Sequence, residues 1–133
     1  MERNNDLRAE QRLLYHWPIW FADKSIDVFM QGQVVDICSE AVAFTFYPCE
    51  ISLFPSQPIT AHFSVPICGL GGSFAVRNFT REGFACRIDQ INKVLHRAIA
   101  QFSEPLPFRP GEQTCNEADM MALLQILSSQ KGA

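Results

Sequence analysis

The chain has 133 residues, 47% of them apolar and 19% charged, which suits one domain with its own core and excludes wholesale disorder. Its net charge of −3 argues against a general nucleic-acid binder, because such proteins carry a basic face. Residues 1–12 are mostly polar, and no apolar run approaches the roughly 20 residues that span a bilayer. We therefore expect neither a secretory leader nor membrane insertion, and a cytoplasmic protein.

The amino-terminal segment and the strands are predicted from polarity and apolar alternation. Residues 1–12 are too short and polar to pack alone, so we expect a flexible arm. Pro18 in the first strand indicates an edge or a bulge. Six strands follow from the alternation and the turn residues between them, at 13–22, 30–37, 42–47, 59–67, 73–79 and 83–88. The last two form a hairpin around a turn at 80–83, and the whole indicates a closed or nearly closed antiparallel barrel.

The apolar period changes at Asp89, which is a plausible helix N-cap. A stripe at helical spacing predicts a helix that ends before Pro105. The stripe consists of Ile91, Val94, Leu95, Ala98, Ile99 and Phe102. A linker begins at residue 105, and Thr114 with Glu117 fits a capping box for a second amphipathic helix at 115–129. The predicted fold class is mainly β, a six-stranded antiparallel barrel over 13–104 with one or two carboxy-terminal helices.

The cysteines and histidines offer no sign of a metal or catalytic centre. The cysteines fall at irregular intervals: Cys38, Cys49, Cys68, Cys86 and Cys115. An odd count without a CxxC pair predicts neither a disulfide framework nor a zinc site, so we interpret them as small core residues. The three histidines lie in different predicted elements, and no GxSxG, P-loop or HExxH motif is present. We expect no enzyme activity.

Two short motifs stand in a fixed order. Arg8 and Arg12 are separated by three residues in RAEQR, and Pro18 follows in the first strand. The stretch DICSEA then runs from Asp36 at a strand end to Ala41 at the start of the next strand. This order resembles the PilZ family, whose signature is RxxxR on an amino-terminal loop and DxSxxG in a turn between two strands. The resemblance covers residues 8 to about 102.

The resemblance implies a six-stranded barrel that binds the second messenger cyclic di-GMP, with Arg8, Arg12, Asp36, Cys38 and Ala41 as site residues. Guanidinium groups suit this ligand, because they pair with phosphate, stack on bases and take the guanine O6/N7 edge in a bidentate manner. Asp36 can accept from the guanine amino edge or hold an arginine in place. No cofactor is implied beyond this ligand.

The sequence departs from the family motif at two positions. Cys38 stands where the family has serine and Ala41 where it has glycine. A thiol is a weak hydrogen-bonding group, and losing a hydroxyl hydrogen bond costs about 0.5–1.5 kcal/mol. If the turn requires a positive φ, alanine adds roughly 1–2 kcal/mol. The sum of about 2–3 kcal/mol corresponds to an affinity lower by about 30- to 150-fold.

Other interpretations remain open at this point. Arg8 and Arg12 also fit a solvated polar arm, and Asp36 also fits a turn residue that bonds its own backbone. The alternative function is a PilZ-like interaction module that does not bind the nucleotide. Its protein partner, or a second copy of the chain, would dock on the helix at 115–129, which carries more apolar residues than one stripe needs.

Overall fold

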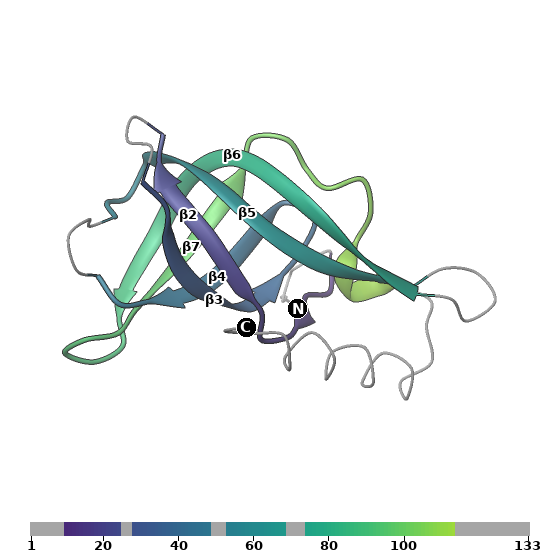
Figure 1. The fold of residues 1–133 in the computed structure, drawn as a ribbon, viewed down its shortest axis with the longest axis horizontal. Coiled ribbons are helices and arrows are strands. Elements are labelled where there is room, and N and C mark those ends of the chain that lie inside the picture. The colour runs from purple at the N-terminus through teal and green to yellow at the C-terminus, as the bar shows by residue number, and fades with distance from the viewer. Residues whose placement is uncertain (1–9, 25–27, 49–52, 69–73, 114–133) are drawn as a thin grey trace, which may run out of the picture.

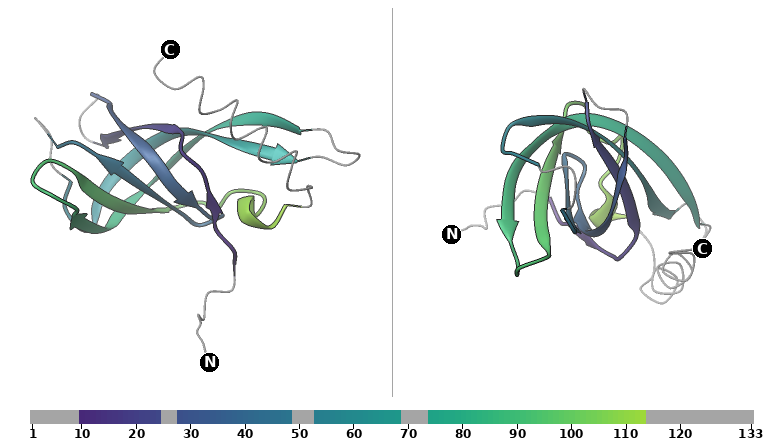
Figure 2. Two further views of the ribbon diagram at one scale, coloured as in Figure 1. Left: turned by 90° about the horizontal axis from the view of Figure 1, so that it is seen from below. Right: turned by 60° about the vertical axis from the view of Figure 1, so that its left-hand side comes forward.

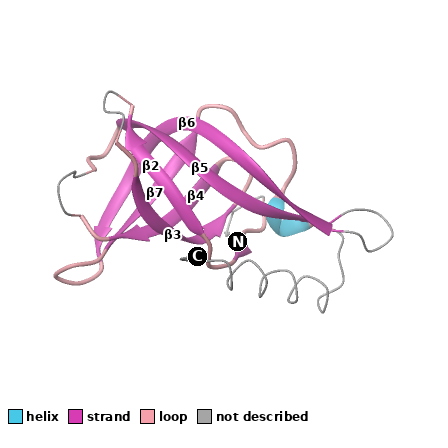
Figure 3. Cartoon of the chain, in the orientation of Figure 1, coloured by secondary structure: helices cyan, strands magenta, loops and turns pink. Residues whose placement is uncertain are grey.

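The computed structural model describes residues 10–24, 28–48, 53–68 and 74–113 (Figure 1). These residues form seven strands and one short 3-10 helix. The elements are β1 (Leu13–Leu14), β2 (Pro18–Asp23), β3 (Met30–Ile37), β4 (Ala41–Phe46), β5 (Gln57–Cys68), β6 (Phe74–Gln90), β7 (His96–Phe102) and η2 (Pro110–Glu112). The helix drawn in Figure 3 is the 3-10 helix η2, and the described part of the chain contains no α-helix and thus no helix that could span a membrane.

Six of the strands close into an antiparallel barrel, which confirms the predicted architecture. The order is β3-β2-β5-β6-β7-β4, and the ring closes because β4 also pairs with β3. Figure 2 shows the curvature of this sheet from two further directions. The short β1 pairs with the carboxy-terminal end of β3 through Leu13 and Ile37, so β1 and β2 form one line interrupted before Pro18. Strand β2 lies between β3 and β5, so the prediction of an edge strand was wrong.

Aromatic side chains fill the interior of the barrel. The ring of Phe21 lies 4.7 Å from that of Phe44 and 5.3 Å from that of Phe46. Phe63 stacks on Phe102 with a centroid distance of 5.4 Å. Full burial of one such side chain contributes about 1.5–3 kcal/mol, so this cluster is a large part of the driving force for closure.

The predicted helix from Asp89 to Phe102 is wrong. Residues His96–Phe102 are strand β7, which pairs with β4 on one side and β6 on the other. Ala98, Ala100 and Phe102 are buried and alternate with more exposed residues, so the true period is two. The preceding turn is organised by Asn92, whose Oδ1 accepts hydrogen bonds from two backbone amides that follow it in the chain. The helical spacing was coincidental, because the strand is selected by partners distant in sequence.

The predicted hairpin over residues 73–88 is also wrong, because its described residues, 74–88, lie within the single strand β6. The expected turn at 80–83 keeps its pairing with β5, from Thr80 opposite His62 to Gly83 opposite Ile59. Gly83 serves a close approach rather than a turn: a Cβ at this position would overlap the carbonyl oxygen of Gln101 in β7. The barrel has six strands because β7 replaces the strand lost when these two merge.

Only part of the predicted amino-terminal arm and carboxy-terminal segment belongs to the described residues. The predicted helix at 115–129 and the arginine Arg8 lie outside the described residues. Residues 10–12 are described, and they are docked on the barrel rather than free in solvent. The backbone amide of Gln11 donates to Glu112 in η2 at 2.7 Å.

Candidate ligand-binding site at the β3–β4 turn

The DICSEA corner forms a tight turn between β3 and β4. The amide of Cys38 donates to the carbonyl oxygen of Ala41 at 2.9 Å, which leaves Ser39 and Glu40 as the two loop residues. The carbonyls of both loop residues accept backbone hydrogen bonds, from Leu106 at 2.7 Å and from Phe102 at 2.8 Å. The turn is therefore held from two sides by the chain at the end of β7 and just beyond it.

A β-bulge places Asp36 on the outer surface of the barrel. The register of β3 against β4 shifts between Val34 and Asp36, so that both Val34 and Ile37 point into the core. Asp36 then lies opposite Ala43, which is buried but does not belong to the core cluster. Bulges redirect side chains in this way. The small side chain of Ala43 leaves room for charged groups above it.

Two arginines from distant parts of the chain pair with Asp36. Nη1 of Arg12 lies 3.3 Å from Oδ1, and Nη2 of Arg97 lies 3.5 Å from Oδ2. The side chain of Asp36 is only 11% exposed, against 27% for Arg12 and 34% for Arg97. A carboxylate this buried needs such partners, because an unpaired buried charge is strongly destabilising.

Residues 10–12 are fixed between the turn and η2. The carboxylate of Glu10 accepts hydrogen bonds from the amide and the hydroxyl of Ser39, at 2.7 and 2.6 Å. On the other side, a Cβ on Gly111 would lie 2.5 Å from the carbonyl oxygen of Gln11, so the approach requires glycine. The hydrogen bond from the Gln11 amide holds the pKa of the Glu112 carboxyl below its usual range.

A pocket of about 360 Å³ opens beside this arrangement. Three of the predicted site residues line it: Arg12, Cys38 and Ala41. The remaining lining residues are Glu10, Glu40, Cys86, Gln101 and Arg109. The charged side chains among all of these are two arginines and two glutamates, so the lining formed by described residues carries no net charge.

Ala41 does not bear the conformational strain that a positive φ would impose. Among the described residues other than glycine, positive φ occurs at Ser56 alone, with φ of 72°. Ala41 is the first residue of β4 and pairs with Gln101. The expected cost of alanine in a left-handed turn therefore does not arise, and its methyl group affects the site only by occupying space in the pocket.

Sequence reasoning missed four residues of this corner: Glu10, Ser39, Arg97 and Arg109. Glu10 lies inside the RAEQR motif, but no sequence pattern indicates its bonds to Ser39. Arg97 lies within the stretch that was predicted to be a helix, so its approach to Asp36 could not be anticipated. Arg109 lies in the predicted linker. Holding an arginine in place was one of the three roles open for Asp36, and the structure pairs it with Arg12.

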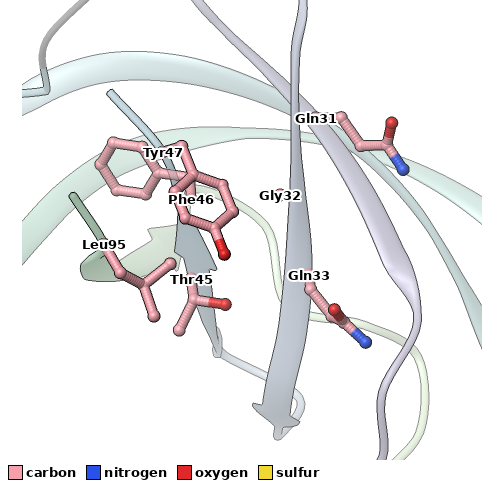
Figure 4. Close-up of a pocket in the computed structure, with 7 residues that line it drawn as sticks. All are labelled: Gln31, Gly32, Gln33, Thr45, Phe46, Tyr47 and Leu95. Carbon is pink, nitrogen blue, oxygen red and sulfur yellow. The ribbon is translucent and has the colours of Figure 1, made fainter. Parts of the chain in front are cut away.

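A second pocket, of about 440 Å³, lies where β3 and β4 diverge (Figure 4). Its lining residues are Gln31, Gly32, Gln33, Thr45, Phe46, Tyr47 and Leu95. None of these carries a charge, so this pocket lacks the groups that would select an anionic ligand. The pocket at the β3–β4 turn is the better candidate site for a phosphate-bearing molecule.

The closed six-stranded antiparallel barrel is the architecture that the PilZ resemblance implies, so the fold is PilZ-like. A solved structure with a similar fold is that of the Bacillus subtilis inhibitor of motility, MotI/DgrA, with a TM-score of 0.55 and 14% sequence identity. The match covers 93% of this chain and 51% of that one, so the chain spans about half the length of that protein. At this identity the likeness shows the fold alone. No family model and no curated protein matches the sequence.

Proposed function

We propose that this chain is a non-catalytic regulatory domain that binds cyclic di-GMP at the β3–β4 turn. The observation that supports this most is the ion pair between Arg12 of the first motif and Asp36 of the second, which are 24 residues apart. The pairing of β1 with β3 brings the RAEQR and DICSEA segments together at this corner. The fold shared with a protein named as an inhibitor of motility supports a regulatory role over a catalytic one.

The proposed contacts follow from the chemistry of the corner. Arg12 uses Nη1 for Asp36, and among the described residues no other acceptor engages its guanidinium, so its remaining donors would bind a phosphate or a guanine edge on the pocket side. Arg8, the first arginine of the same motif, would be a second contact, and Cys38 and Ala41 would contact the ligand from the barrel. The carboxylates of Glu10 and Glu40 line the same pocket and repel a dianion, so we expect weak affinity.

Calorimetric titration of the full chain with cyclic di-GMP tests the proposal. We expect saturable heat for the wild type, and a loss of at least about tenfold in affinity for Arg12→Ala. Arg77→Ala is the matched control, because Arg77 is exposed near the amino-terminal end of β6, whereas the pocket is lined by Cys86 near the other end of that strand. Cyclic di-AMP should bind more weakly, because it lacks the guanine edge that arginine recognises. No heat at near-millimolar cyclic di-GMP would refute the proposal.

The second candidate is an interaction module of the same fold that does not bind the nucleotide. It is favoured by the electroneutral pocket lining and by the Glu10 carboxylate, which already occupies the donors of Ser39. The proposed docking segment, residues 115–129, lies outside the described residues. This candidate predicts no calorimetric signal together with self-association of the full chain in light scattering, or capture of a partner that Leu124→Asp abolishes.

A further inference from the structure

Arg97 is the one guanidinium of the corner that belongs to neither motif and does not line the pocket among the described residues. It lies on β7, opposite Thr45 of β4, and its Nη2 faces Oδ2 of Asp36. Its Nε is buried and has no hydrogen-bond acceptor in the described part of the chain. A buried donor without an acceptor is costly, so the contact between Nη2 and Asp36 must offset that cost.

The other nearby carboxylate is already engaged. Asp89 of β6 is the register partner of Arg97 across the β6–β7 ladder. Its Oδ2 lies 3.0 Å from Nε of Arg87, so Arg87 holds it in a local ion pair. Arg97 therefore pairs with Asp36 rather than with Asp89.

The two oxygens of Asp36 are divided between the two arginines. Oδ1 faces Nη1 of Arg12 at 3.3 Å, and Oδ2 faces Nη2 of Arg97 at 3.5 Å. An aspartate with both oxygens free would take arginine in a bidentate fork, which is the preferred geometry of this pair. Such a fork would use a second Arg12 nitrogen that can otherwise face the pocket.

We propose that Arg97 is a positioning residue for ligand binding: by occupying Oδ2 of Asp36, it restricts Arg12 to a single bond and leaves the rest of its guanidinium free for the ligand. This inference rests on the proposed function, because it assigns Arg12 to the grip on cyclic di-GMP. It goes beyond the two motifs, which contain no such residue. Arg97 acts on the ligand only through Asp36 and Arg12.

The first test is affinity for cyclic di-GMP, measured by calorimetry on the full chain. Arg97→Gln should weaken binding by about tenfold, and Arg97→Lys should retain affinity to within about threefold, since an ammonium group can still occupy Oδ2. In an Asp36→Asn background, Arg97→Gln should change affinity by less than about twofold, because the route to Arg12 is already cut. Arg77→Gln is the control. An equal loss in both backgrounds would overturn the proposal.

The second test needs no ligand, so it separates this inference from the proposed function. Nitrogen NMR of the free protein reports the rotation of the Arg12 guanidinium about its Nε–Cζ bond. Arg97→Gln should slow this rotation by at least about threefold, because a bidentate pair with Asp36 replaces a single bond. Should Arg97→Gln fail to fold, Arg97→Met keeps the aliphatic stem and serves in its place. Unchanged rotation would refute the role of Arg97, whereas slowed rotation in a chain that binds no cyclic di-GMP would refute only the proposed function.

Discussion

At the scale of single residues, Cys38 and Ala41 are the two positions where the β3–β4 corner departs from the PilZ motif. Both line the pocket beside Arg12. The structure separates their effects, because Ala41 has ordinary strand geometry whereas Cys38 presents a thiol in place of a hydroxyl. If the corner binds cyclic di-GMP as proposed, we expect the cost in affinity at Cys38 to be one hydrogen bond and the cost at Ala41 to be the volume of one methyl group.

Cys38→Ser should therefore tighten cyclic di-GMP binding by about three- to tenfold, the equivalent of one added hydrogen bond. Adding Ala41→Gly should bring the total to about tenfold or more by opening space for the ligand. Calorimetry on the single and double variants measures both steps. Cys86→Ser is the matched control, because Cys86 lines the same pocket outside the motif. Unchanged or weaker binding would show that the alignment of DICSEA with the family motif is wrong.

Glu10 and Glu40 form a second natural pair for comparison. Both line the pocket, but only Glu10 accepts hydrogen bonds from Ser39. Glu10→Gln should lower the free energy of unfolding by about 1 kcal/mol, because one charge-assisted acceptor is lost and residues 10–12 are held less firmly. Glu40→Gln should change it by less than about 0.5 kcal/mol. Urea unfolding measures both free energies, and equal effects would mean that the hydrogen bonds from Ser39 to Glu10 do not stabilise the fold.

At the scale of elements, the structure depends on contacts that bring segments of the chain against one another. η2 holds residues 10–12 through the bond between Gln11 and Glu112. Strand β6 approaches β7 so closely at Gly83 that no side chain fits there. The first junction joins residues 10–12 to residues 110–112, and the second brings β6 against β7 in the wall of the barrel.

The junction at η2 makes stability depend on pH. The pKa of Glu112 is lowered in the folded protein, so its contribution is present above the ordinary glutamate value of about 4.3 and is lost as the pH falls through the folded value. Between pH 7 and pH 3, Glu112→Gln should therefore show a smaller fall in melting temperature than the wild type. Glu104→Gln is the control. Parallel curves for Glu112→Gln and the wild type would contradict the linkage.

The junction at Gly83 predicts a large effect from a small substitution. Gly83→Ala places a Cβ on the carbonyl of Gln101, so β6 and β7 must separate, and we expect a loss of about 3 kcal/mol in the free energy of unfolding. Arg77→Ala, at an exposed position on the same strand, should be nearly neutral. Chemical denaturation measures the difference. A neutral Gly83→Ala would mean that the strands do not meet as described.

At the scale of the whole molecule, binding and stability are linked. A ligand that binds only the folded barrel stabilises it by about 2.7 kcal/mol when its free concentration is 100 times the dissociation constant. We therefore expect cyclic di-GMP to raise the melting temperature by about 8–11 °C under these conditions. Arg12→Ala should remove about half of this shift or more at the same nucleotide concentration, because a tenfold weaker ligand contributes about 1.4 kcal/mol. A shift that persists in Arg12→Ala would place the ligand elsewhere on the chain.

Local sequence patterns determined much of this protein. Apolar alternation located β2, β3, β4 and most of β5, because one face of each strand meets the aromatic core and the other meets solvent or polar groups. The two motifs indicated the corner between β3 and β4, and holding an arginine was one of the roles that they left open for Asp36. The closed six-stranded barrel also followed from the spacing of strands and turns.

Only the tertiary structure decided the final strands and the composition of the site. Residues 96–102 satisfy a helical and an extended period alike, and pairing with β4 and β6 selects the strand. Gly83 is typical of a turn in the sequence, but in the structure glycine is required there because β7 lies too close for a Cβ. Arg97 reaches Asp36 because β4, the strand between them, pairs with both β3 and β7. These outcomes depend on partners far away in sequence, and local patterns carry no information about such partners.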